Sequence, residues 1–220
     1  MQKRSYGKIL SVNLKHNFKM PIVSALGVLI LTLLLFNTTA LQSKEAARPI
    51  EFLLCFTGVM LLVPVFYPEQ DETIRDVIRS KKIDYTVVCI VRVLYSTAAM
   101  AALTAFMVLI MKWGECDVGM DHFWSGAADA WFLGAVGFTA AGLTNNITAG
   151  YMSTVLYYLA NYGLRNELGP FYLFAMSYSG SSDTAGPKIL GAVILMGVTL
   201  TLCRNRQKMS WTDRQILWSR

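Results

Sequence analysis

The sequence is poor in charged residues. They make up 15% of its 220 residues, and hydrophobic residues make up 54%, whereas about a quarter of a soluble domain is charged. Long stretches of the chain carry no charge at all. About 20 apolar residues are enough to cross a bilayer as a helix. The composition therefore excludes an ordinary soluble domain and favours an integral membrane protein.

Motifs for nucleotide and metal chemistry are also missing. The chain has no GxxxxGK[ST] phosphate-binding loop, so it is not expected to bind ATP in that way. It has no HExxH motif, and its two histidines, His16 and His122, are expected on opposite sides of a membrane. The four cysteines form no CxxC pair, which argues against a zinc site or a redox pair. We therefore expect this chain to be neither an enzyme nor the carrier of a metal or cofactor.

The chain does contain six apolar stretches of membrane-spanning length. They are residues 21–41, 50–67, 86–111, 123–143, 147–164 and 187–203, with polar segments such as 42–49 and the short turn 144–146 between them. We predict an all-α membrane domain of six transmembrane helices over residues 1–220. Residues 1–19 are basic and carry an apolar residue every fourth position, which predicts an amphipathic helix in the membrane interface. A solvated basic tail is the alternative.

The lysines and arginines predict the orientation in the membrane. With the amino terminus inside, residues 1–19, 69–85 and 204–220 are cytoplasmic and hold 14 of the 20 basic residues, whereas external segments hold five. Arg92 completes the count within the third helix, and Cys116 is expected in an external loop. Both termini are therefore expected on the cytoplasmic side of the cell membrane. The net charge of +6 needs no nucleic acid to explain it.

Residues 69–85, between the second and third helices, have the most distinctive sequence. The segment starts with acidic residues and ends with basic ones, which complements a helix dipole. Ile74, Val77 and Ile78 form an i, i+3, i+4 apolar stripe. These features predict a short amphipathic cytoplasmic helix that can dock a partner. A solvated loop helix without a partner is the alternative.

This segment resembles the cytoplasmic loop between the second and third helices of ABC-2 type transporter permeases. In that family an acidic residue is followed four positions later by Thr, then by apolar residues, a basic cluster and a basic residue inside the next helix. Glu69, Thr73 and Arg92 match this pattern, as do the apolar residues at 74–78 and the basic residues at 79–82. An acidic residue replaces the family's usual Gly before the Thr, and the usual Pro after the apolar residues is absent.

The resemblance implies a function, partners and site residues. ABC-2 permeases have an interfacial helix, six spans and a re-entrant outer segment before the last span, which residues 165–186 would form. They work as homodimers or heterodimers of permeases with a stand-alone ABC ATPase subunit, which carries the ATP and Mg²⁺. The expected function is ATP-driven export of a hydrophobic or amphipathic substrate, such as a peptide, drug or lipid-like molecule. The residues expected to couple to the ATPase are Glu69, Thr73, Ile74, Arg75, Val77, Ile78 and Arg79.

Isolated polar residues within the apolar stretches are further candidates. An ionised Asp129 inside the fourth helix needs a partner or a water-filled cavity. Arg92 is expected to extend to the headgroups or to pair with an acid, and Glu51 is expected to be a solvated acid at the outer start of the second helix. Aromatic residues in the outer half form either a substrate-facing wall or an aromatic belt. The candidates for the substrate path are Asp129, Tyr157, Tyr158, Tyr162, Phe171 and Tyr172.

Two other functions stay open. A non-transporting membrane protein, such as an immunity or assembly factor for a toxic peptide, fits the same topology. An ion-coupled secondary transporter is the other alternative. It would need ionisable residues near the middle of the membrane, and the expected positions of Asp129 and Arg92 are both away from it.

Overall fold

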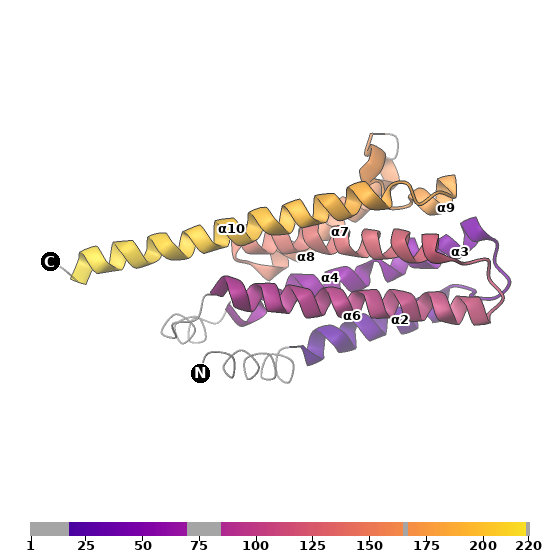
Figure 1. Ribbon diagram of the computed structural model, residues 1–220, viewed down its shortest axis with the longest axis horizontal. Helices are drawn as coiled ribbons and strands as arrows, with labels where there is room; N and C mark the ends of the chain where they lie inside the picture. The colour runs from indigo at the N-terminus through magenta and orange to yellow at the C-terminus, as the bar shows by residue number, and fades with distance from the viewer. Residues whose placement is uncertain (1–17, 70–84, 165–166, 219–220) are drawn as a thin grey trace.

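The computed structural model describes residues 18–69, 85–164 and 167–218, which form helices and short connections with no strand among them. Six helical segments in this part of the chain, which we call legs, run along a common axis, and successive legs alternate in direction (Figure 1). The legs are α2 (Lys19–Leu35); α3 (Ser43–Pro49), η1 (Ile50–Leu54), α4 (Phe56–Leu62) and η2 (Val63–Glu69) in succession; α6 (Tyr85–Trp113); α7 (Met120–Thr144); α8 (Ile147–Gly163); and α10 (Ala185–Trp218). Two short elements, η3 (Gly169–Phe171) and α9 (Ala175–Ser179), lie between α8 and α10.

The surface of the bundle is apolar. Leu94, Leu156 and Leu190, from three different legs, are each more than half exposed. Among the described helices, Ser43–Tyr67, Thr86–Trp113 and Ala185–Asn205 are long and apolar enough to cross a membrane, and α2 is apolar but shorter. Apolar surface that is unfavourable in water is stable against lipid. The apolar helices therefore indicate a membrane protein.

The two ends of the bundle differ. The start of α2, the end of η2, the start of α6 and the far end of α10 lie toward one end, whereas α3 and α9 lie at the other (Figure 1). We call these the terminal end and the α3–α9 end. The connection from α6 to α7 also lies at the α3–α9 end. Cys116 in this connection is buried, and its Sγ donates to the carbonyl of Thr38 at 3.1 Å.

Residues 43–49 are helical, so the prediction of a polar loop over residues 42–49 is wrong. They form α3, which continues through Pro49 into η1, a π-turn in which the N–H of Cys55 donates to the carbonyl of Ile50 at 3.1 Å. A π-turn adds one residue to a helix without ending it. The second predicted helix therefore begins about two turns earlier than residue 50.

The first and last predicted helices also end elsewhere. α2 ends at Leu35 because Asn37 follows closely, and its Oδ1 accepts the N–H of Thr39 at 3.3 Å in place of a helical bond. α10 continues through the predicted tail to Trp218, since no Gly or Pro follows Gly197 to interrupt it.

The predicted short turn between the fourth and fifth helices is confirmed. Asn145 adopts a left-handed conformation with φ +56°, which a short polar side chain tolerates. Asn146 then caps α8, because its Oδ1 accepts the N–H of Thr148 at 2.9 Å. The turn joins α7 and α8 as adjacent antiparallel helices.

α7 is the central helix of the bundle and packs against α4, α6, α8 and α10. Small residues allow this close approach. A Cβ added to Gly58 of α4 would lie 1.8 Å from the carbonyl oxygen of Ala130, and one added to Gly134 would lie 2.7 Å from the carbonyl oxygen of Gly58. The two backbones are therefore in direct contact.

We predict that Gly58→Ala destabilises the protein by about 1–3 kcal/mol, because the added methyl overlaps the backbone of α7. Unfolding of the detergent-solubilised protein by increasing SDS would measure the change. Gly27→Ala is the matched control, since nothing lies within 4 Å of its Cβ position. Equal stability of the two variants would show that α4 and α7 are not in backbone contact.

Candidate functional site

Glu51 caps α9 from a distant part of the chain. It lies in η1 and is 1% exposed. Its Oε1 accepts the N–H of Met176 at 2.8 Å and the hydroxyl of Ser125 at 3.3 Å. Its Oε2 accepts the N–H of Ser177 at 2.8 Å and also the Ser177 hydroxyl. The N-cap residue of α9, Phe174, makes no side-chain cap, so Glu51 supplies the acceptors that the free N–H groups need.

The expectation that Glu51 is a solvated acid is wrong. It rested on a helix that begins at residue 50, which would leave position 51 in the first, exposed turn. The leg begins at Ser43 instead, so Glu51 is more than two turns inside it. The α9 segment then packs against α3 and completes the burial.

Asp129 and Lys188 form a buried ion pair between α7 and α10. Both residues are 0% exposed, and Nζ of Lys188 donates to Oδ1 of Asp129. Asp129 thus has the partner that a buried carboxylate requires. That partner is a lysine that the charge count assigns to an external segment. The other carboxylate oxygen, Oδ2, is buried without a hydrogen-bond partner in the described part of the structure.

Glu51, Asp129 and Lys188 make up one buried charge cluster. Glu51 lies close enough to both other residues for their charges to interact. The cluster brings together two acids and one base from three different legs. Such a group can hold a proton or orient a polar ligand. Among the described residues, no set of three or more His, Cys, Asp or Glu could hold a metal ion.

Close helix contacts bring these residues together. A Cβ added to Gly126 would lie 2.2 Å from Cγ2 of Ile50, so η1 approaches α7 closely enough for Glu51 to reach Ser125. On the other side, Gly191 of α10 has Phe132 of α7 3.0 Å from its Cβ position. The small residues of α7 and α10 therefore position the cluster.

The tyrosines of α8 hold the segment that precedes α9. The hydroxyl of Tyr157 donates to the carbonyl of Phe171 at 2.6 Å. Oδ1 of Asn161 accepts the N–H of Leu173 at 2.9 Å. Tyr158 instead donates to the carbonyl of Phe52 in η1, at 2.7 Å. Backbone groups at residues 171 and 173 are thus satisfied by side chains of α8.

Stacked rings surround these hydrogen bonds. Phe52 stacks on Phe174 with centroids 4.4 Å apart, and Phe132 stacks on Phe171 at 5.3 Å. Among the aromatic candidates for a substrate path, Tyr162 and Phe171 are exposed, at 55% and 38%. The remaining candidates, Tyr157, Tyr158 and Tyr172, are half-buried.

No family model matches this chain, and no curated protein or solved structure matches it.

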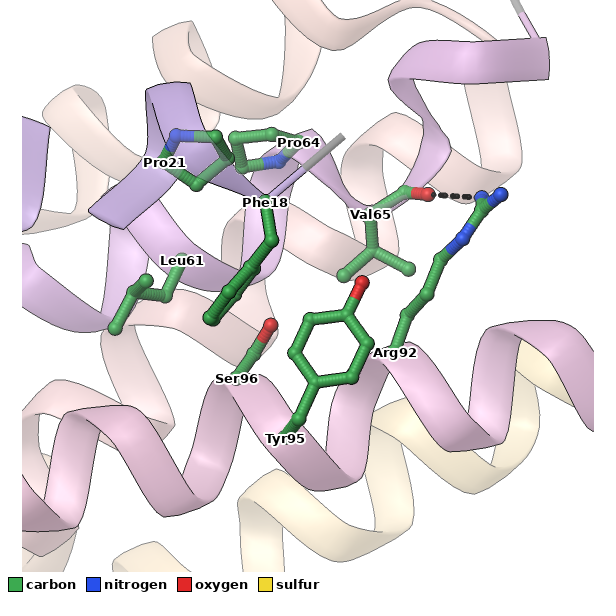
Figure 2. A pocket seen from close by; sticks show the side chains of 8 residues that line it. All are labelled: Phe18, Pro21, Leu61, Pro64, Val65, Arg92, Tyr95 and Ser96. Carbon is green, nitrogen blue, oxygen red and sulfur yellow. Dashed lines mark hydrogen bonds between the residues drawn. The ribbon is translucent and has the colours of Figure 1, made fainter. Parts of the chain in front are cut away.

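Arg92 joins two legs near the terminal end. It is 3% exposed, and its Nη1 donates to the carbonyl of Val65 in η2 at 2.9 Å. The expectation that it extends to the headgroups is therefore wrong. Figure 2 shows Arg92, Tyr95 and Ser96 of α6 beside Val65 and Pro64. The lining residues surround a partly open pocket of about 10 Å³, roughly the space of one water.

Most of the residues expected to contact an ATPase lie outside the described residues. Glu69 is the last residue of η2. Thr73, Ile74, Arg75, Val77, Ile78 and Arg79 fall in residues 70–84, and residues 1–17 of the expected interfacial helix are likewise outside. Phe18 is described and is buried, with its ring 4.3 Å from that of Tyr95 on α6. It therefore packs inside the bundle.

Sequence reasoning missed Glu51 and Lys188 as parts of the site. Each is a charged residue close to the predicted start of an apolar stretch, a place where solvated charges are common. One pattern in the sequence could have revealed the cluster. The second, fourth and sixth apolar stretches each place one charged residue on the same expected side of the membrane, namely Glu51, Asp129 and Lys188. Opposite charges at one depth are a reason to expect a pair.

We predict that Glu51→Gln loosens α9. The amide group of Gln donates where Glu51 accepts from Ser177, so charge-assisted hydrogen bonds are lost, at a cost of about 2 kcal/mol. Amide hydrogen exchange at Met176 and Ser177 should then become roughly 30-fold faster. Glu45→Gln, an exposed acid of α3, is the control and should leave these rates unchanged. Equal exchange rates in the two variants would show that Glu51 does not cap α9.

Proposed function

We propose that the chain is the membrane subunit of an ATP-driven exporter of the ABC-2 class, moving a hydrophobic or amphipathic substrate out of the cell. The observation that carries the proposal is the folded η3–α9 segment. It lies between the fifth and sixth legs and at the end of the bundle away from the start of α6 (Figure 1). The resemblance to ABC-2 permeases calls for a re-entrant segment at that place.

The six legs are proposed to be six membrane spans. At 1.5 Å per residue, the 17 residues of α2 and of α8 extend about 26 Å, and the 25 residues of α7 extend about 37 Å. The hydrocarbon core is about 30 Å thick, so α2 and α8 match the short end of the range of spanning helices. The lysine and arginine asymmetry then places the terminal end in the cytoplasm and the α3–α9 end outside.

In this proposal ATP bound to a partner subunit supplies the free energy. This chain forms the substrate path and transmits the movement of the partner subunit to the membrane helices. Residues 69–85 would dock a stand-alone ABC ATPase, which holds ATP and Mg²⁺. The bond from Arg92 to Val65 ties the last part of η2 to α6, so movement of the docked segment would reach both legs. A second permease, either an identical copy or a related chain, would complete the path.

The proposed substrate path passes the exposed aromatic rings near η3. Tyr162 and Phe171 are exposed, and Tyr157 and Tyr158 are half-buried with their hydroxyls hydrogen-bonded. Apolar and aromatic walls suit an amphipathic substrate. Asp129 is paired with Lys188, so it would contribute through the cluster and not by direct contact.

An ion-coupled transporter is the second candidate, because the structure buries three ionisable residues together. Glu51, Asp129 and Lys188 are each at most 1% exposed. Buried acids in membrane helices commonly serve ion pathways. ATP-independent uptake or efflux driven by a pH gradient in vesicles that contain this chain alone would favour this candidate.

We predict that the α3–α9 end faces outward. In a variant without native cysteines, Asp117→Cys in the exposed α6–α7 connection should react with a membrane-impermeant thiol reagent in intact cells. Thr148→Cys, an exposed position at the start of α8, should react only after the cells are permeabilised. The opposite pattern would invert the topology and place residues 69–85 outside, where no ATPase could bind.

We predict that Ile74→Asp with Ile78→Asp abolishes ATPase binding, because charges replace the apolar stripe of the coupling segment. Co-purification of a stand-alone ATP-binding subunit should fall at least tenfold, with unchanged amounts of the chain in the membrane. Gln70→Asp with Ser80→Asp adds the same charge to the same segment and should retain binding. Undiminished binding by the Ile74 and Ile78 variant would exclude this contact.

A further inference from the structure

The hydrogen bonds of the charge cluster distinguish its two carboxylates. Glu51 accepts four hydrogen bonds, two on each oxygen, from Met176, Ser125 and Ser177. An ionised carboxylate has about four acceptor positions and no donor. On each oxygen one of the two donors is a backbone N–H group, which cannot accept a hydrogen bond, although the hydroxyls of Ser125 and Ser177 can accept as well as donate. The surroundings of Glu51 therefore suit its ionised form.

Asp129 has the opposite surroundings. Its Oδ1 accepts from Lys188, but its Oδ2 is buried with no hydrogen-bond partner in the described part of the structure. A buried charged oxygen without a donor is costly, because it has lost water and gained nothing. Oδ2 is thus an open position for a ligand with positive charge.

The neighbours of Asp129 supply too little positive charge. α10 contributes Lys188 and η1 contributes Glu51, while Cys55, which follows η1, and Tyr157 of α8 also lie close enough to interact with Asp129 electrostatically. The other elements packed against this part of α7 present uncharged residues: Gly58 of α4 on Ala130, Thr104 of α6 beside Gly126, and Phe171 of η3 on Phe132. With both acids and the lysine ionised, the described cluster has one excess negative charge.

We propose that Asp129 is a proton-binding site, with the proton on Oδ2 and with Glu51 and Lys188 ionised beside it. A hydronium ion transfers its proton to Oδ2, an O–H bond forms, and one water is released. The cluster is then neutral, and Oδ1 still accepts from Lys188. The positive charge of Lys188 then compensates the negative charge of Glu51, which caps α9. The proton thus completes the charge balance beneath α9. This inference does not rest on export, because proton binding belongs to the chain alone.

Infrared difference spectroscopy of the full chain in phosphatidylcholine nanodiscs tests the proposal. At neutral pH the protein should show the C=O band of a protonated carboxyl group, and the band should shift in D₂O. Asp129→Asn should abolish the band. Asp121→Asn, an exposed acid on the same helix, should retain it. Retention of the band in Asp129→Asn, or its loss in Glu51→Gln alone, would overturn the assignment.

A second variant keeps the test decisive if Asp129→Asn fails to fold. Lys188→Met removes the positive charge beside Asp129, so the protonated band should persist to a higher pH than in the wild type. An unchanged titration would contradict the proposal. Loss of the wild-type band on adding NaCl at constant pH would show that a metal cation occupies Oδ2, and this would also overturn it.

Discussion

The backbone between α8 and α10 is the constraint on which the rest of the structure depends. Helices satisfy their own N–H and C=O groups, but η3 and the start of α9 leave several of them open within an apolar bundle. Side chains of the long helices satisfy these groups. Tyr157 donates to the carbonyl of Phe171, and Asn161 accepts the N–H of Leu173. Glu51 accepts the N–H groups of Met176 and Ser177. A buried acid is thus the consequence of a segment of short, interrupted helices folded against longer apolar helices.

That acid in turn determines the charges around it. An ionised Glu51 at 1% exposure requires positive charge nearby, and Lys188 of α10 is within electrostatic reach. Lys188 also pairs with Asp129, so α7 and α10 are joined by an ion pair in addition to their apolar contacts. Breaking a buried pair is far more costly than never forming one. The three legs that carry the cluster are therefore held in one arrangement.

The sequence predicted the helices well because their signal is local. Length, hydropathy and short polar breaks are properties of neighbouring residues, and they located α6, α7 and α8 and the turn at Asn145 to within a few residues. The site depends on contacts between distant residues. Glu51 and Ser177 are far apart in the chain, and no local pattern shows that they meet. The helical conformation of residues 43–49 was also missed, because the π-turn lets the helix run past Pro49.

The π-turn at Ile50–Leu54 has a consequence for how this helix tolerates change in length. It contains one residue more than an α-helix needs, and each residue of an α-helix turns the chain by 100°. Loss of one residue there would restore regular winding while leaving α4 in register with α7. Glu51 would then rotate away from α9 even though Gly58 kept its contact with Ala130. The rotation of the first half of this leg is thus set by the cap on α9, and that of the second half is set separately by packing against α7.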